Sequence, residues 1–198
     1  MRVSAVLVTK GDRDVSKVVD TLTHFDEVIV WDNSKACKDV KVYGRFVGAM
    51  MARNDIVYVQ DDDCIVSPAA IAGQFLFGDI VCNVPQERRP EYAGTGITLI
   101  GWGCVFGKSK LASFRSYLEV YPQDELFERE CDRIFTWLNR SSMRLVDTGL
   151  EHLPEAFNDN RMGREHRHRR DYDAIRARLC TLDAYAREAR RCTGVEIV

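Results

Sequence analysis

The chain of 198 residues is 45% hydrophobic and has a formal net charge of −2. This length suits one well-buried domain better than two, and the near-neutral total gives the whole protein no attraction to nucleic acid or to an anionic membrane. The first apolar run is too short for a signal peptide, and no stretch approaches the roughly 20 apolar residues that cross a bilayer, so we expect a soluble, cytoplasmic protein.

The first third of the chain alternates apolar strands with amphipathic helices. In chain order the predicted elements are a strand at 3–9, a helix at 14–25, strands at 27–31 and 39–43, a helix at 45–53 and a strand at 55–60. Such alternation favours a parallel sheet whose strands are connected by helices. Ligands bind at the carboxyl edge of such sheets, where we expect the polar residues that follow the strands. These are Thr9, Asp32, Asn33 and Asp61–Asp63.

The rest of the chain mixes strands, helices and loops less regularly. Residues 85–96 contain two Pro and two Gly, and residues 151–170 are polar and irregular, so both segments are predicted loops. The predicted elements around them are helices at 69–77, 108–119, 124–138 and 171–190, and strands at 80–84, 97–100, 104–106 and 143–146. We therefore predict one α/β domain with a mostly parallel central sheet and helices on both faces.

Asp61, Asp62 and Asp63, the aspartate triplet, stand together at the end of a predicted strand. Adjacent carboxylates repel one another, so a bound cation or polar ligand is a natural reason for collecting them there. Mg²⁺ and Mn²⁺ prefer oxygen ligands and can bridge an Asp-x-Asp pair to phosphate oxygens. The alternative, a solvated acidic turn, is disfavoured by the position at the carboxyl edge of an α/β sheet. The triplet therefore predicts a site for Mn²⁺ or Mg²⁺ with a diphosphate.

Three motifs, in their order and spacing, resemble the nucleotide-sugar half of glycosyltransferases with the GT-A fold, in particular the exostosin-like and family-2-like groups. They are Trp31-Asp32-Asn33, Gly44-Arg45-Phe46 and Tyr58-Val59-Gln60-Asp61-Asp62-Asp63, the last of which contains the Asp-x-Asp (DXD) motif. A looser similarity continues through Gly101-Trp102-Gly103 and Glu130-Cys131-Asp132. The resemblance implies a single GT-A (Rossmann-like) domain over residues 1–198, with a nucleotide-sugar-binding half (1–100), an acceptor and catalytic half (101–170) and a C-terminal helix (171–198).

The resemblance also implies which residues bind the donor and its metal. The donor residues are Thr9, Arg13, Asp32, Asn33, Arg45, Asp61, Asp62, Gly101, Trp102 and Gly103. Asp61 and Asp63 would bind Mn²⁺ or Mg²⁺, with Asp63 as the main ligand. A late histidine, His166 in preference to His168, would join them. The competing interpretation of the polar members is that they are turn or surface side chains.

The catalytic carboxylate is implied by Glu130-Cys131-Asp132, which resembles the Glu-Asp helix of this fold. Here Cys131 separates the two acids, so both Glu130 and Asp132 are candidates, and the spacing to the apolar Trp137-Leu138 favours Asp132. In an inverting enzyme Asp132 would deprotonate the acceptor hydroxyl as general base. In a retaining enzyme it would instead orient the acceptor or stabilise the cationic centre, and one sequence leaves both open.

The implied reaction is metal-dependent transfer of a hexose from a nucleoside diphosphate sugar, with a UDP-sugar favoured, to an acceptor hydroxyl. Residues 161–191 hold ten Arg and two His against five acids. This basic segment makes a hydroxylated base in DNA one possible acceptor, as for phage-type DNA glycosyltransferases, beside protein, glycan and lipid acceptors. The alternatives are a nucleotidyltransferase, and a non-catalytic module that binds nucleotide sugars or nucleic acid.

Overall fold

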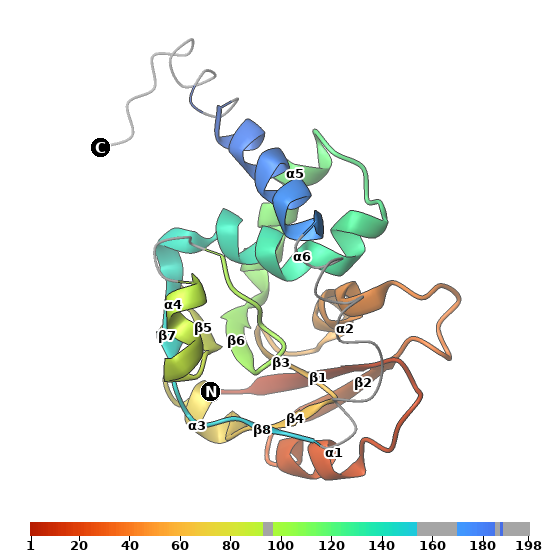
Figure 1. Ribbon diagram of the computed structural model, residues 1–198. Coiled ribbons are helices and arrows are strands. Elements are labelled where there is room, and N and C mark those ends of the chain that lie inside the picture. Colours follow the sequence, from red (N-terminus) through yellow and green to blue (C-terminus); the bar gives the residue numbers. More distant parts are fainter. Residues whose placement is uncertain (93–96, 154–169, 185–186, 188–198) are drawn as a thin grey trace.

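The computed structural model describes residues 1–92, 97–153, 170–184 and 187, and its centre is a six-stranded sheet (Figure 1). The sheet has the order β2-β1-β3-β6-β5-β7, and β4 pairs with β8 in a second, two-stranded sheet. The strands are β1 (Val3–Thr9), β2 (Glu27–Asp32), β3 (Ile56–Asp61), β4 (Cys64–Ile65), β5 (Ile80–Asn83), β6 (Cys104–Gly107), β7 (Met143–Val146) and β8 (Glu151–His152). Strand β6 is antiparallel to β3 and β5, whereas the β1–β2, β1–β3 and β5–β7 pairs are parallel. The predicted mostly parallel central sheet is confirmed.

Helices cover both faces of this sheet (Figure 1), as predicted. The helices are α1 (Ser16–Leu22), α2 (Gly44–Met51), α3 (Pro68–Ala72), α4 (Arg89–Tyr92), α5 (Phe114–Leu118) and α6 (Glu125–Leu138), and residues 170–184 form a further one. The 3-10 turns are η1 (Lys41–Tyr43), η2 (Gln86–Arg88), η3 (Lys108–Ser113) and η4 (Arg140–Ser142). Leu22 of α1 and Ile71 of α3 belong to the apolar cluster on one face, and Phe46, Phe114 and Phe135 of α2, α5 and α6 belong to the cluster on the other.

The strands are apolar on both sides because alternate side chains enter different clusters. In β3, Val57 and Val59 pack under α2, α5 and α6, whereas Tyr58 packs under α1 and α3. All three are 0% exposed. Full burial of one such side chain stabilises the fold by about 1.5–3 kcal/mol. A continuous apolar run is therefore what this doubly covered sheet requires.

The register of the parallel strands brings their carboxyl ends to one edge. Thr9 at the end of β1 lies opposite Asp32 at the end of β2, and Val8 lies opposite Asp61 at the end of β3. The polar residues that follow these strands consequently lie at the predicted edge of the sheet. We call it the ligand edge, and it is the frame for the site described below.

The strand predicted at 39–43 is wrong, because this segment forms the 3-10 turn η1. The buried Asn33 side chain accepts a hydrogen bond from Val40 N at 3.2 Å and donates one to Lys41 O at 3.0 Å. Lys41 has a φ of 55°, a left-handed conformation that interrupts an extended strand. Side-chain hydrogen bonds from a residue several positions earlier therefore decide the local structure.

The strand predicted at 97–100 is also wrong, because its backbone bonds to side chains of α6. Thr98 N donates to Thr136 Oγ1 at 3.1 Å, and Ile100 N donates to Asp132 Oδ2 at 3.2 Å. These partners take the place of a neighbouring strand. The segment thereby becomes a connection between α6 and the ligand edge.

Helix α6 is fixed at its start and along one side. Asp124 caps it by accepting a hydrogen bond from Phe127 N at 2.8 Å, and Arg178 of the C-terminal helix contacts the same carboxylate at 2.7 Å. Ile175 and Leu179 of the C-terminal helix are buried in the core.

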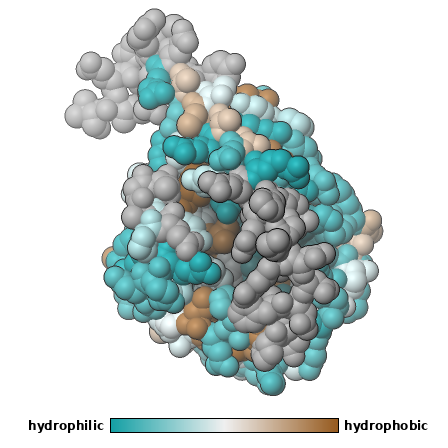
Figure 2. Space-filling view, in the orientation of Figure 1, coloured by the Kyte–Doolittle hydropathy of each residue, from teal (hydrophilic) through white to brown (hydrophobic). Residues whose placement is uncertain are grey.

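None of the helices in the described ranges has the length and apolar character needed to span a membrane. The face seen in Figure 2 is largely hydrophilic, with hydrophobic side chains in small areas.

Candidate functional site

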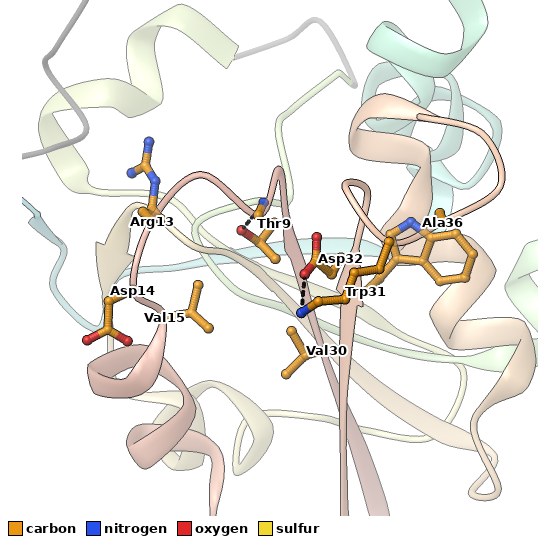
Figure 3. A pocket seen from close by; sticks show the side chains of 10 residues that line it. Thr9, Arg13, Asp14, Val15, Val30, Trp31, Asp32 and Ala36 are labelled. Atoms are coloured by element: carbon orange, nitrogen blue, oxygen red, sulfur yellow. Dashed lines mark hydrogen bonds and ion pairs between the residues drawn. The ribbon is translucent and has the colours of Figure 1, made fainter.

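A cavity of about 520 Å³ opens at the carboxyl ends of β1 and β2 (Figure 3). Its wall is formed by Thr9, Gly11, Arg13, Asp14, Val15, Val30, Trp31, Asp32, Lys35 and Ala36. Val15 and Val30 give it an apolar part, and Thr9 and Asp32 give it a polar part at the ends of the strands. Its volume and mixed lining suit a small ligand with both a flat apolar group and polar groups.

Arg13 borders this cavity, and two of its N–H groups have no hydrogen-bond acceptor among the described residues. Its Nε is 3.7 Å from Asp12 Oδ1 and 3.8 Å from Asp62 Oδ2, which are distances of ion pairs rather than hydrogen bonds. Both Nε and Nη1 are buried, and neither has a hydrogen-bond partner within the described part of the chain. Buried donors are almost always hydrogen-bonded in folded proteins. The cavity therefore offers a guanidinium group to an anionic ligand such as a phosphate.

Asp32 and Asn33 are adjacent but face different surroundings. Asp32 lines the cavity, and hydrogen bonds from Lys35 and Ser34 lower the pKa of its carboxyl group to about 2. Asn33 is 8% exposed and uses its side chain to hold Val40 and Lys41 in the turn described above. Of the two, Asp32 is therefore the one placed to contact a ligand in the cavity.

The members of the aspartate triplet also differ from one another. Burial raises the pKa of Asp61 to about 7, against the opposing effect of Arg45, which donates to this carboxylate at 2.5 Å. Burial likewise raises the pKa of Asp62, against the opposing effects of Thr9 and Arg13. The half-buried Asp63 side chain makes no hydrogen bond or ion pair with any described residue. One carboxylate of the triplet is thus open to a cation.

The donor atoms at this edge fit a hard cation. Asp61 and Asp63 provide the carboxylate oxygens that Mn²⁺ and Mg²⁺ prefer. Within the described ranges, no three His, Cys, Asp or Glu side chains form a group that could hold a metal. His166 and His168 lie outside the described residues, but the segment that leads to them starts beside the triplet, since Leu153 N donates to Asp63 O at 2.9 Å. The described donors suit a cation that takes further oxygen ligands from water and a diphosphate.

The Gly-Trp-Gly motif makes room for neighbouring protein groups. A Cβ atom on Gly101 would lie 1.9 Å from Asp61 Oδ2, and Gly101 O accepts a hydrogen bond from Asp61 N at 2.8 Å. Gly103 has a φ of +99°, and a Cβ atom there would lie 2.7 Å from the Tyr58 hydroxyl. Trp102, half-buried between them, has its backbone carbonyl held by Asn83 at 3.0 Å. These glycines thus allow a rigid connection to lie directly against the triplet.

Substitution of Gly101 by alanine tests this close approach. Because the added methyl group would overlap the Asp61 carboxylate, we expect Gly101→Ala to lower the free energy of unfolding by about 1–3 kcal/mol, as overpacking usually does. The control is Gly107→Ala, since a Cβ atom at Gly107 would meet Ser109 Oγ at an ordinary 3.6 Å. Urea unfolding followed by circular dichroism measures both values. Equal stabilities of the two variants would contradict the proposed overlap.

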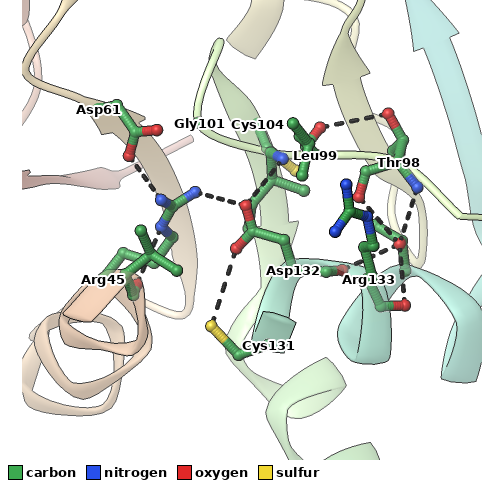
Figure 4. A network of polar contacts seen from close by, with 12 residues as sticks. Arg45, Asp61, Thr98, Leu99, Gly101, Cys104, Cys131, Asp132 and Arg133 are labelled. Carbon is green, nitrogen blue, oxygen red and sulfur yellow. Dashed lines mark hydrogen bonds and ion pairs between the residues drawn. The ribbon is translucent and has the colours of Figure 1, made fainter. Parts of the chain in front are cut away.

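Arg45 connects the triplet to α6 (Figure 4). Its Nη1 donates to Asp132 Oδ2 at 2.8 Å and its Nη2 donates to Asp61 Oδ1 at 2.5 Å. Burial disfavours the charged guanidinium, but Asp132 and Asp61 outweigh this effect and raise the pKa of Arg45. Burial raises the pKa of Asp132, and Arg45 opposes this shift. Three charged groups from α2, β3 and α6 therefore meet at the ligand edge.

Glu130 and Asp132 both lie on α6, but their side chains contact different partners. Glu130 is 3% exposed and pairs with Arg133, one turn along the same helix. Burial raises the pKa of Glu130, against the opposing effect of Arg133. Asp132 faces Arg45 and, through it, the aspartate triplet. The structure therefore brings Asp132, and not Glu130, to the site.

Several residues and contacts of the site were not among those predicted from the sequence. Val15 and Val30 line the cavity, although isolated valines in strand and helix patterns normally indicate core. Lys35 pairs with Asp32 at 2.7 Å, and its spacing of three residues in a turn was the signal for this contact. The contacts of Ile100 N with Asp132 and of Leu153 N with Asp63 O involve backbone atoms, which leave no mark on residue type.

Comparison with known proteins supports the fold. The sequence matches no protein-family model and no curated protein sequence. The structure is similar to glucosyl-3-phosphoglycerate synthase from Mycobacterium tuberculosis, solved with Mn²⁺, UDP-glucose and phosphoglyceric acid, with a TM-score of 0.55, 16% identity, and coverage of 90% of this chain and 79% of that one. It is also similar to TarS from S. aureus, solved with UDP-GlcNAc, with a TM-score of 0.52, 16% identity, and coverage of 75% of this chain and 57% of that one. These similarities confirm the predicted GT-A fold.

Proposed function

We propose that this GT-A domain is a metal-dependent glycosyltransferase that moves a sugar, of the hexose type, from a UDP-sugar to an acceptor hydroxyl. The observation that carries the proposal is the convergence at the ligand edge of a cavity bordered by the unsatisfied donors of Arg13, the open carboxylate of Asp63, and Asp132. The bound molecules of the similar proteins, UDP-glucose with Mn²⁺ in one and UDP-GlcNAc in the other, support the same class of donor.

The donor is proposed to lie along this edge in a definite direction. Its base and ribose would occupy the cavity, with the apolar side chains of Val15 and Val30 against the base and Asp32 at the polar end. Arg13 would then donate to the diphosphate. Asp62, beside Arg13, would face the ribose or the donor sugar.

The reaction requires negative charge on the departing diphosphate to be neutralised. Mn²⁺ or Mg²⁺ bound by Asp63, with Asp61 beside it, would supply positive charge there, and Arg13 would supply more. Asp132 is proposed for the acceptor side. Its Oδ2 atom accepts from both Arg45 and Ile100 N, whereas the one contact of Oδ1 among the described residues is the Cys131 Sγ atom at 4.0 Å. In an inverting reaction Oδ1 would take the acceptor proton, and in a retaining one Asp132 would orient the acceptor.

The acceptor is proposed at the level of a hydroxyl group. A hydroxylated base in DNA stays a prediction from the basic segment 161–191, much of which lies outside the described residues. Protein, glycan and lipid hydroxyls are the other classes. Nucleotidyl transfer is disfavoured because the loop from Thr9 to Arg13 holds a single Gly instead of a Gly-rich run. Binding alone is disfavoured because the carboxylate proposed as general base, Asp132, would have no role in it.

Thermal-shift measurements with nucleotides test this function. We expect UDP and UDP-sugars to raise the melting temperature in the presence of Mn²⁺ or Mg²⁺, since a ligand that binds the native state stabilises it by mass action. Removal of the metal with EDTA should abolish most of the shift. The nucleosides without phosphate serve as controls and should produce little change. No response to any nucleoside diphosphate, with or without metal, would discard the proposed function.

A further inference from the structure

We propose that Arg45 is a positioning residue, which fixes the carboxylate of Asp61 on the donor side and the carboxylate of Asp132 on the acceptor side relative to each other. The inference rests on the proposed function, because it concerns how the same site is held. Figure 4 shows the guanidinium between the two carboxylates, each of which comes from a different element. Asp61 and Asp132 follow Arg45 by 16 and 87 positions in the sequence, and the Arg45 side chain joins them.

Burial leaves Arg45 little surface for a ligand. Its side chain is 1% exposed, and all three of its nitrogens donate to protein oxygens. Besides the two carboxylates, its Nε donates to Val42 O at 3.1 Å. With the side chain 1% exposed, a diphosphate could contact this guanidinium only if neighbouring protein groups moved away from it. The sequence predicts a direct contact of Arg45 with the nucleotide-sugar donor. In its place we assign Arg45 an indirect role, that of positioning Asp61 and Asp132.

Asp61 and Asp132 are linked a second time through the segment Ile100-Gly101, which contacts the carboxylate of Asp132 and the backbone of Asp61. Ile100 N donates to Asp132 Oδ2 at 3.2 Å, and the next residue, Gly101, accepts from Asp61 N at 2.8 Å. A closed ring of contacts results, which runs from Asp61 through Arg45, Asp132 and Ile100-Gly101 back to Asp61. Because Arg45 contacts both carboxylates directly, we expect a change in its side chain to shift both of them and not only one.

The shape of the guanidinium, and not only its charge, is what this arrangement uses. Arginine presents a planar fork whose two terminal nitrogens point in different directions, whereas lysine has a single terminal nitrogen on a flexible stem. Lysine at position 45 would keep the positive charge between the carboxylates but could not donate along both directions in the same fixed geometry. Arg45→Lys therefore separates the positioning role from charge neutralisation.

The experiment compares the wild-type protein with Arg45→Lys. The matched control is Arg53→Lys, since Arg53 is 77% exposed and pairs with Glu27 at the surface. Calorimetric titration with UDP and Mn²⁺ measures donor-side binding, hydrolysis of UDP-glucose and UDP-GlcNAc without acceptor measures turnover, and circular dichroism checks the fold. We expect Arg45→Lys to fold and to bind UDP with nearly wild-type affinity, because Arg13 and Asp63, the main proposed contacts of the diphosphate and the metal, do not contact Arg45 in the described structure. Its turnover should fall about 100-fold, as expected for a catalytic group misplaced by about 1 Å.

Two results would overturn the inference while leaving the proposed function intact. One is wild-type turnover in Arg45→Lys, and the other is lost UDP affinity with unchanged turnover at saturation, because that pattern marks a direct donor contact. If Arg45→Lys does not fold, Gly101→Ala disturbs the same ring from the side of Asp61, and unchanged turnover there would overturn the inference. A wild-type protein that neither binds UDP nor hydrolyses either sugar nucleotide would overturn the proposed function and this inference together.

Discussion

Asp63→Ala is expected to remove the metal dependence of UDP binding and to weaken binding in the presence of Mn²⁺ by more than about 100-fold, since even the loss of an outer partner of a metal ligand costs about 10–100-fold. The reason is that the three carboxylates of the triplet differ in the side chains that they contact. Asp61 is held by Arg45, and Asp62 lies beside Arg13, whereas the Asp63 carboxylate is open to a cation. Calorimetric titration of UDP with Mn²⁺, and again with EDTA, measures the effect.

The control for this variant is Asp79→Ala, because Asp79 pairs with Arg144 at 3.1 Å and precedes β5, away from the ligand edge. It should bind UDP and Mn²⁺ as the wild type does. The same titration tests His166 as a metal ligand, with His152 as the control. We predict that His166→Ala weakens Mn²⁺-dependent binding and that His152→Ala, opposite Cys64 in the β4–β8 pair, does not. Wild-type metal dependence in Asp63→Ala would contradict the metal assignment of the triplet.

Asp132→Asn is expected to lower the rate of sugar transfer by about 10³-fold, within the range that a general base contributes, while UDP affinity stays near the wild-type value. The amide keeps the volume of the side chain and can still accept a hydrogen bond from Ile100 N, so the fold should be preserved. It lacks the negative charge that accepts the proton or stabilises the cationic centre. Single-turnover measurements with the donor bound separate this chemical step from binding.

Glu130→Gln is the matched control on the same helix. Glu130 is as buried as Asp132 but pairs with Arg133, so its substitution should change stability more than turnover. Loss of transfer in Glu130→Gln together with wild-type transfer in Asp132→Asn would exchange the two roles. Unchanged transfer in both variants would show that neither acid is catalytic.

The sequence predicted the architecture well because strand and helix periods are local properties. The alternation of β1, α1, β2, α2 and β3 is a pattern of side-chain burial, and the register of parallel strands then places Thr9, Asp32 and Asp61 at one edge. Strands predicted at 39–43 and 97–100 were wrong because their backbone hydrogen bonds go to the side chains of Asn33 and Asp132. Side-chain partners of this kind, 7 residues from Val40 and 32 residues from Ile100, do not recur with a strand or helix period.

The same limit applies to individual site residues. Arg45 opens a helix, where a polar side chain normally faces solvent, and nothing in its neighbours shows that it is buried between two carboxylates. The choice between Glu130 and Asp132 depends on which face of α6 meets α2, a matter of helix packing. Contacts between elements far apart in the chain must therefore be seen in three dimensions before roles can be assigned.

The reversed direction of β6 decides which connections can vary without cost to the core. Since β5 is parallel to β3 in direction and β6 is antiparallel to both neighbours, the end of β5 and the start of β6 lie at the same edge. The whole connection from residue 84 to residue 103 therefore begins and ends on the side of the cavity. Within it Ile97, Thr98 and Ile100 are buried, whereas residues 86–88 are exposed, so insertions at 86–88 would leave the strand pairing and the contact of Ile100 with Asp132 untouched. On the proposed function, exchanges at these exposed residues could change which acceptors reach the ligand edge without cost to the core.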